Sequence, residues 1–99
     1  MRESKGPAIH PGEILRELYL EPLSLTPYAL AKTLRIPRTR LERIVAEKVG
    51  ISADTALRLA KHFRTSPEFW LNLQAAYDLK REAELLKDEL AQIEEVAAA

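Results

Sequence analysis

Apolar residues recur along this chain at the three- and four-residue spacing that gathers them on one face of an α-helix. No stretch alternates apolar and polar residues as a half-buried strand does, and no Asn-Gly or Asp-Gly hairpin turn occurs. Ser, Thr and Pro residues of the kind that start helices stand before the apolar segments. The pattern therefore predicts an all-α domain of five helices with short connections. These helices begin at or near Pro11, Thr26, Pro37, Ser52 and Ser66.

The apolar faces of these five segments predict the hydrophobic core. We expect Trp70 to hold the fifth helix against the fourth, and Ala31 is small where the third helix must cross the second closely. The predicted inward residues are Ile14, Leu15, Leu18, Tyr19, Ala29, Leu30, Leu34, Leu41, Ile44, Val45, Ala56, Leu57, Leu59, Ala60, Phe63, Phe69, Trp70, Leu73 and Tyr77.

Beyond Asp78 the apolar spacing becomes alternate steps of four and three, which is the a/d spacing of a coiled-coil heptad. No helix breaker follows, so we expect residues 79–99 to form an amphipathic, acidic helical tail on a domain of residues 1–78. This narrow stripe needs a partner surface, and three stay open: the same helix of a second subunit, the body of the protein, or a different protein. The stripe consists of Leu79, Ala83, Leu86, Leu90, Ile93 and Ala97.

Composition excludes several classes of protein. The 99 residues suffice for one small domain, and the absence of Cys excludes disulfides, cysteine zinc sites, Fe–S clusters and thiol nucleophiles. No apolar run approaches the roughly 20 residues of a membrane span. The polar start from Met1 to Pro7 leads into no apolar signal core. We therefore expect a cytoplasmic protein with no membrane partner.

Catalytic chemistry has little support in the sequence. The two histidines, His10 and His62, have no metal-ligand spacing, and the three glycines are isolated rather than gathered in a phosphate-binding loop. We expect His10 to serve a turn before the first helix and His62 to lie near the end of the fourth. The sequence therefore predicts no enzyme, no metal site and no small-molecule cofactor.

Charge is segregated along the chain although its sum is zero. Residues 32–48 carry six basic and two acidic side chains, a local excess of +4. Residues 78–99 carry seven acidic and three basic ones, a local −4. Taken alone, such clusters are more often two solvated helix faces, so the position of the basic cluster in the fold decides what it means.

The basic cluster coincides with a predicted helix-turn-helix at residues 26–47, which is a short helix, a tight turn and a second helix with a basic start. With Leu41 and Ile44 packed inward, the opposite side of that second helix faces solvent. Arg can bridge guanine and Thr can meet a thymine methyl group in the major groove of DNA. We therefore expect bases to be read by Arg38, Thr39, Arg40 and Arg43.

Intrahelical ion pairs are the competing explanation for these arginines, Arg38 with Glu42 and Arg43 with Glu47. Basic residues in the first turn of a helix oppose its macrodipole, and Arg before Glu at this spacing is the weaker order. Helix stability alone would not place Arg38 and Arg40 there. DNA binding is therefore the better explanation.

Four segments carry a family resemblance that covers nearly the whole chain. They are Ile9–Leu15 (IHPGEIL), Tyr28–Ala31 (YALA), Ile51–Leu59 (ISADTALRL) and Thr65–Gln74 (TSPEFWLNLQ), the last and most specific followed by Tyr77-Asp78-Leu79. Together they resemble the HigA-type antitoxins, a branch of the Xre/Cro-like repressors. The resemblance implies a lambda-repressor-like helix-turn-helix domain and a homodimer on double-stranded operator DNA with an inverted repeat. It also implies repression of a shared promoter and neutralisation of a HigB/RelE-like mRNA endoribonuclease toxin.

Three positions depart from the pattern of such repressors. Pro27 replaces a Gln that often contacts phosphate, Arg35 replaces the Gly of the turn, and Pro37 replaces a Ser before the recognition helix. Arg35 is therefore expected to take a left-handed backbone conformation, at about 1–2 kcal/mol. In place of the missing Gln, we assign the phosphate contacts to Thr26, Lys32, Arg35 and Lys48.

The fifth helix and the tail offer the most apolar surface without an assigned partner. We expect the dimer to form there, with the acidic tail turned away from DNA because carboxylates and phosphates repel each other. The alternative is that residues beyond about Leu86 are a frayed appendage and that the dimer forms through the body alone. The expected seam consists of Phe69, Leu73, Tyr77, Leu79 and Leu86.

Two other functions stay open. A protein-interaction module whose degenerate helix-turn-helix no longer binds DNA would explain Pro27 and Arg35. A stand-alone helix-turn-helix regulator would share the fold and lack a toxin. The neighbouring reading frame discriminates between these, because a toxin partner is expected to be a small basic protein of about the same length.

Overall fold

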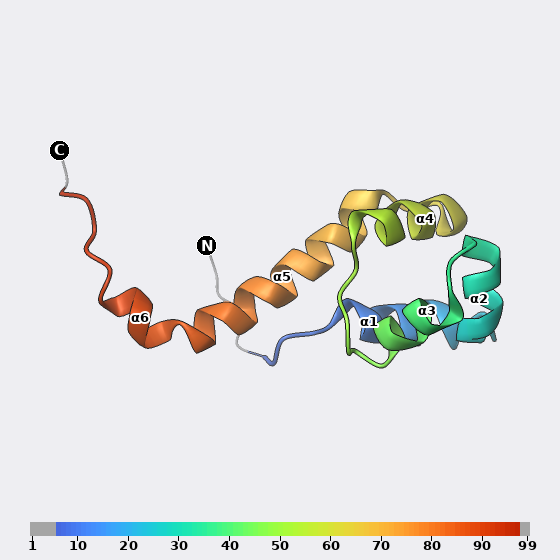
Figure 1. The fold of residues 1–99 in the computed structure, drawn as a ribbon, viewed down its shortest axis with the longest axis horizontal. Helices are drawn as coiled ribbons and strands as arrows, with labels where there is room; N and C mark the ends of the chain where they lie inside the picture. Colours follow the sequence, from blue (N-terminus) through green and yellow to red (C-terminus); the bar gives the residue numbers. More distant parts are fainter. Residues whose placement is uncertain (1–5, 98–99) are drawn as a thin grey trace.

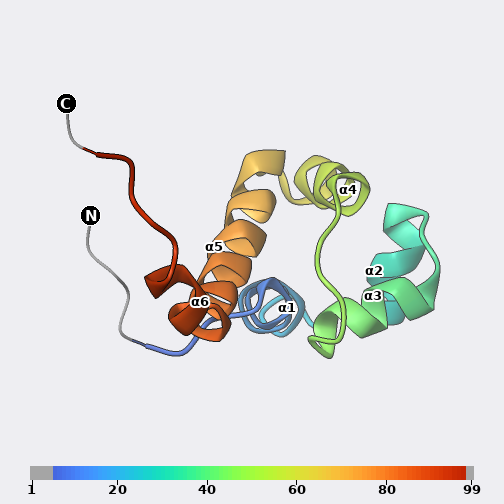
Figure 2. The ribbon, with the colours of Figure 1, turned by 60° about the vertical axis from the view of Figure 1, so that its left-hand side comes forward.

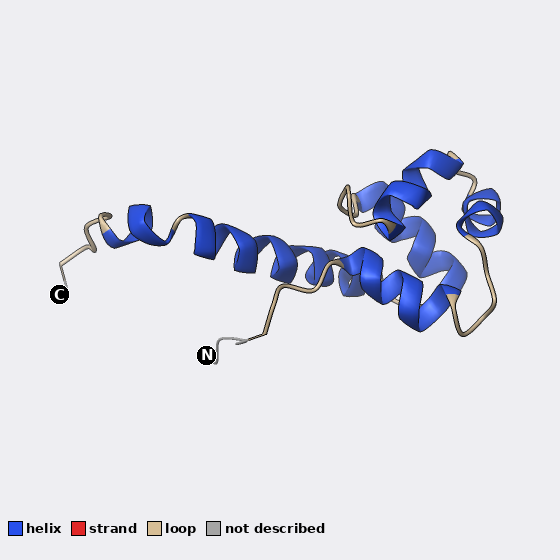
Figure 3. Cartoon of the chain, turned by 90° about the horizontal axis from the view of Figure 1, so that it is seen from below, coloured by secondary structure: helices blue, strands red, loops and turns tan. Residues whose placement is uncertain are grey.

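A computed structural model describes residues 6–97 as helices and connecting loops, with no strand among them (Figure 3). The prediction of an all-α fold is confirmed. The polar residues 1–5 and the terminal residues 98–99 lie outside the described part of the predicted ranges 1–78 and 79–99. The elements are α1 (Pro11–Ile14), the π-helix η1 (Leu15–Leu20), α2 (Pro27–Leu34), α3 (Arg38–Val45), α4 (Ala53–Phe63), α5 (Pro67–Leu85) and α6 (Lys87–Ala91).

Side-chain caps begin four helices where the sequence places Ser, Thr or His before an apolar segment. Thr26, Ser52 and Ser66 each accept a hydrogen bond from the backbone N–H three residues further on. Nδ1 of His10 accepts one from the N–H of Gly12 at 2.8 Å, so His10 serves the turn before α1 as predicted. The starts of α1, α2, α4 and α5 therefore agree with the prediction.

The first predicted helix continues as a π-helix, which changes the direction that its side chains face. Backbone hydrogen bonds in η1 join residues five apart, as from the N–H of Glu21 to the carbonyl of Arg16. Residues five apart then share a face, and Leu15 and Leu20 are both buried. Leu18, which the α-helical period turns inward, is 63% exposed, so that prediction is wrong.

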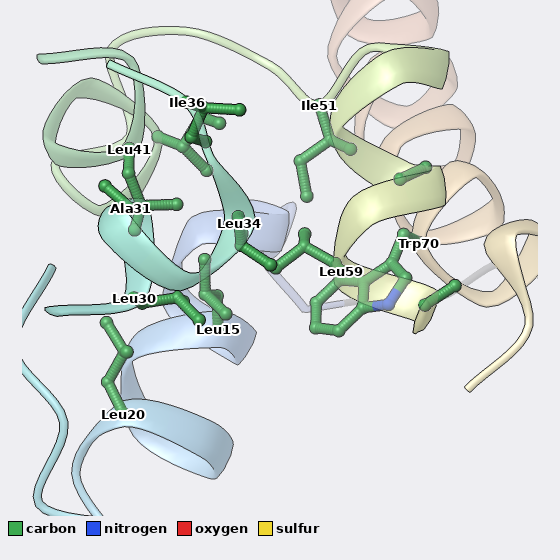
Figure 4. Packing of buried hydrophobic residues seen from close by; sticks show 13 residues of the cluster. Leu15, Leu20, Leu30, Ala31, Leu34, Ile36, Leu41, Ile51, Leu59 and Trp70 are labelled. Atoms are coloured by element: carbon green, nitrogen blue, oxygen red, sulfur yellow. The ribbon is translucent and has the colours of Figure 1, made fainter. Parts of the chain in front are cut away.

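The hydrophobic core lies where the helices of the body meet (Figure 4), and Trp70 of α5 is fully buried in it. The indole Nε1–H of Trp70 donates to Oγ1 of Thr65 at 2.8 Å. Its ring centroid lies 6.4 Å from that of Phe63 on α4 and 5.1 Å from that of Tyr19 on η1, so Trp70 holds α5 against α4 as predicted. Leu57 is 59% exposed because α4 packs on one side only, and its predicted burial is wrong.

Helix α5 projects from the body and gives the molecule extents of 54 × 24 × 23 Å (Figures 1 and 2). It passes the expected domain boundary after Asp78 without a break. The predicted helical tail over residues 79–99 is helical only in part. The helix breaks at Leu86, whose φ is −95° and ψ 6°, and α6 ends at Ala91, so Ile93 lies outside it. The narrow apolar stripe has no surface here to support a longer helix.

Candidate nucleic-acid interface

Helices α2 and α3 form the helix-turn-helix, and a left-handed residue closes its turn. Arg35 has φ 61° and ψ 43°, the left-handed conformation predicted for it. Its N–H donates to the carbonyl of Lys32 at 3.2 Å, and that of Ile36 donates to the carbonyl of Ala31 at 3.1 Å, which satisfies two of the last four carbonyls of α2. Pro37 occupies the N-cap position in extended conformation, so α3 begins one residue later than predicted.

Helix α3 buries one side and presents the other to solvent. Leu41 and Ile44 have almost no exposed surface, and α3 packs on α1 and α2. The opposite side is exposed and lines a shallow hollow together with a lysine of the following loop. This hollow is lined by Thr39, Glu42, Arg43, Ala46 and Lys48. The structure therefore brings two predicted base contacts and one predicted phosphate contact onto one surface.

Arg38 lies at the exposed start of this face, between an acidic and an aromatic side chain. Its Nε is 3.5 Å from Oε1 of Glu42, and its guanidinium carbon is 6.0 Å from the ring centroid of Tyr28 on α2. The first intrahelical pair considered above therefore exists. Such an exposed pair contributes about 1 kcal/mol or less, so DNA can displace it. The other acid considered there, Glu47, pairs with Arg16 of η1 at 3.3 Å.

Arg40 points toward the start of α4 rather than along the exposed face. Its Nη1 donates to Oδ1 of Asp54 at 2.9 Å, and the same oxygen accepts a hydrogen bond from Nε of Arg58 at 2.8 Å. Arg58 first, and Arg40 second, hold the pKa of the Asp54 carboxyl below its usual range. Arg40 is thus tied to another helix, which distinguishes it from the solvent-facing Arg43.

Arg16 holds the C-terminal end of α3, although no sequence pattern marks it. Its Nη1 donates to the carbonyl of Val45 at 2.6 Å, and its Nη2 lies 3.3 Å from Oε2 of Glu47, a residue with φ 62°. A basic side chain at this end satisfies a carbonyl that has no partner within the helix. Asp54 and Arg58 were missed as well; their spacing of four within α4 is the one local signal for them.

The predicted phosphate contacts are not gathered in one hollow. Lys48 is beside the exposed face of α3, and Lys32 is exposed on α2. Oγ1 of Thr26 accepts from the N–H of Ala29 at 3.1 Å, which leaves its hydroxyl hydrogen free to donate. Arg35 lines a second hollow between α2 and α4. That hollow is lined by Thr33, Leu34, Arg35, Asp54, Leu57, Arg58, Lys61, His62 and Arg64.

The predicted seam residues divide between the body and solvent. Leu73 packs against the hydrophobic core, and the ring of Tyr77 is in edge contact with the imidazole that caps α1. Phe69, Leu79 and Leu86 are 36%, 71% and 41% exposed. A subunit contact along this stretch would therefore use these three residues more than the other two.

Whether the described part of the chain holds a metal site or a membrane span also bears on its function. Within residues 6–97 no three His, Cys, Asp or Glu side chains gather as a metal site, and no helix is both long and apolar enough to span a membrane. His10 is buried, and that burial lowers its pKa. What the exposed face of α3 offers is positive charge and hydrogen-bond donors, which are the groups that meet phosphates and base edges.

A helix-turn-helix whose second helix is basic and exposed defines a class, the helix-turn-helix DNA-binding proteins. The helix-turn-helix family (HTH_3) matches residues 15–70, more than half of the chain, and this chain belongs to that family. The predicted fold is thereby confirmed.

Solved structures and curated relatives narrow the likeness to one branch. Pseudomonas aeruginosa antitoxin HigA, solved with the higBA promoter, is 41% identical and superposes with a TM-score of 0.88 over 91% of this chain and 99% of that chain. Antitoxin GraA in complex with its operator is 39% identical, with a TM-score of 0.89 over 99% of both chains. Virulence-associated protein I of Dichelobacter nodosus is 58% identical over 78 residues, 79% of this chain and 72% of the relative. The predicted resemblance to HigA-type antitoxins is confirmed.

Proposed function

We propose that this protein is a DNA-binding autorepressor and antitoxin with no catalytic activity of its own. The outward face of α3 carries the proposal. With Leu41 buried behind them, Thr39 and Arg43 stand on an open surface beside Lys48. A helix fits the major groove, where Arg bridges guanine and Thr meets the thymine methyl group. Two similar proteins were solved with promoter or operator DNA, which supports the same use here.

Contacts to the DNA backbone position the reading helix and make binding depend on salt, because neutralised phosphates release counterions. The candidates lie on or beside α2 and α3 and are cationic or hydroxyl-bearing. We assign base reading to Arg38, Thr39, Arg40 and Arg43, and phosphate contacts to Thr26, Lys32, Arg35 and Lys48.

The active form in this proposal is a homodimer. One helix-turn-helix reads only a few base pairs, whereas two related by a dyad read an inverted repeat when their recognition helices lie ~34 Å apart. Leu79 of α5, Leu86 at the helix break and Leu90 of α6 keep 71%, 41% and 49% of their surface exposed, which suits a seam. The acidic tail then faces away from the phosphates, because like charges repel.

The antitoxin activity would be a direct contact with a HigB/RelE-like mRNA endoribonuclease toxin. Antitoxin HigA-1 of Vibrio cholerae, 37% identical over 79 residues (80% of this chain and 74% of that protein), supports this part of the proposal. One observation favours the interaction module instead: Pro27 stands at the first position of α2 and has no donor for phosphate.

Two measurements test the proposal. Fluorescence anisotropy with a duplex from upstream of the protein's own gene should show at least ~10³-fold tighter binding than with a scrambled duplex of the same composition. Equal affinity for both duplexes would leave the interaction module as the better function. The product of the neighbouring reading frame, expressed alone, should arrest growth. Co-expression with this protein should relieve the arrest, and the two proteins should purify together as a complex. Operator binding without such a complex would indicate a stand-alone regulator.

A further inference from the structure

The ion-pair network between α3 and α4 is anchored to the backbone of the helix-turn-helix. Nη1 of Arg58 donates to the carbonyl of Leu34 at 2.9 Å and lies 3.4 Å from that of Arg35, at the end of α2. Nε of the same guanidinium donates to Oδ1 of Asp54 at 2.8 Å. Asp54 is therefore fixed relative to the turn between α2 and α3.

Asp54 in turn fixes Arg40, whose Nη1 donates to the same carboxylate oxygen at 2.9 Å. The carboxylate lies in the first turn of α4, where the helix dipole favours negative charge. The side chains of Arg40 and Asp54 are 40% and 53% exposed. Solvent and DNA can therefore reach the pair, and an exposed pair of this kind opens easily.

We propose that Asp54 is a specificity-determining residue, which withholds Arg40 from the phosphates of arbitrary DNA and releases it to the operator. The inference rests on the proposed function of α3. A phosphate oxygen and the Asp54 carboxylate offer Arg40 comparable partners, so non-specific DNA gains little by breaking the pair. A guanine edge accepts two parallel hydrogen bonds from one guanidinium and competes better. The pair thus lowers affinity for random DNA more than affinity for the operator, which is how specificity is increased.

The variant Asp54→Asn tests this, because it removes the charge and nearly preserves the shape of the side chain. Binding to operator and scrambled duplexes is measured at several salt concentrations. Affinity for the scrambled duplex should rise about twofold to fivefold, the scale of one exposed ion pair. The slope of log affinity against log salt should steepen by about 0.9, because one more phosphate is neutralised. Operator affinity should change less.

Two controls distinguish the release of Arg40 from the general effect of losing a negative charge. In an Arg40→Gln background the Asp54→Asn change should leave the salt slope unaltered. Asp88→Asn removes the same charge from exposed α6 and should leave the slope as in the parent. Circular dichroism and thermal unfolding verify that each variant is folded.

The outcomes are distinguishable. An unchanged salt slope in Asp54→Asn, or a change that persists in the Arg40→Gln background, overturns this inference alone when the parent prefers its operator. A parent without that preference overturns the proposed function. If Asp54→Asn does not fold, Arg40→Gln decides by itself. It should weaken operator binding and leave binding to the scrambled duplex unchanged, and equal weakening of both would contradict the withholding of Arg40.

Discussion

Two regions of the molecule contain the same kinds of apolar residue and bury them to different extents. They are the body, up to Asp78, and the projecting part, from Leu79 onward. In the body Leu15, Leu41 and Trp70 have no exposed surface. In the projecting part Leu79 and Leu85 keep 71% and 69% of theirs. Body helices cross one another and cover each other's apolar faces, whereas the end of α5 meets the loop residues Gly6, Pro7 and Ala8 rather than a crossing helix (Figure 1). An apolar pattern therefore predicts burial where a second surface exists, and it predicts a partner where none does.

Truncating a buried side chain of the body should have the largest effect on stability. Trp70→Ala should lower the free energy of unfolding by about 3–5 kcal/mol, because it leaves a cavity among η1, α4 and α5. Urea denaturation followed by circular dichroism measures this. Val96→Ala, at a side chain 93% exposed, is the control and should stay within about 0.5 kcal/mol of the parent. A loss below about 1 kcal/mol in Trp70→Ala would contradict a core built around it.

Removal of the projecting part should change assembly rather than the body. Truncation after Asp78 deletes Leu79 and Leu86, so sedimentation should show a monomer. Operator affinity should fall about a hundredfold, because two linked reading helices bind far more tightly than one. A truncated protein that stayed dimeric with unchanged binding would confine the seam to the body. The exposed stripe would then need a different partner, such as the toxin.

Acid should weaken the junction of the two regions, where His10 meets Tyr77 of α5 at a ring distance of 4.8 Å. Burial lowers the pKa of His10 from its ordinary value of 6.5, against the opposing influence of Glu47. Its Nδ1 must be unprotonated to accept the N–H of Gly12. The unfolded chain therefore binds more protons than the folded one as pH falls through 6.5. This contribution to stability is complete above that pH and declines below it.

Urea unfolding at pH about 7.5, 6.5 and 5.5 measures the decline. His10→Asn retains a side-chain oxygen that can cap α1 and should flatten the dependence on pH. Only the slopes of the free energy of unfolding against pH are compared, because the variant also changes packing. Equal slopes in parent and variant would show that another group titrates.

Local chemistry made much of the fold predictable. The caps at Thr26, Ser52 and Ser66 depend on hydrogen-bond partners three residues away, so the sequence displays both partners at once. The left-handed Arg35 is predicted by the family resemblance, because such repressors have Gly at this turn. The exposed face of α3 follows from the inward spacing of its apolar residues.

Other features depend on contacts that no local pattern contains. Arg40 and Asp54 are 14 residues apart, and their pairing requires α3 and α4 to be in place. Leu18 faces solvent because one turn of the chain takes the π-helical period, for which the sequence has no clear signal. The helix break at Leu86 has neither Gly nor Pro beside it. Each of these three features lies where packing between elements overrides a local preference or fails to support it.

Operator titration with two arginine variants tests most directly the claim that the outward face of α3 reads DNA. Arg38→Ala and Arg43→Ala should each weaken operator binding by about 1–3 kcal/mol, with the fold intact by circular dichroism. Lys87→Ala removes one positive charge from exposed α6, far from α2 and α3 (Figure 1), and should bind like the parent. The operator affinity of the parent, and of each variant that still binds, should fall steeply as the salt concentration rises. If both arginine variants bound the operator as tightly as the parent does, α3 would not be the recognition helix.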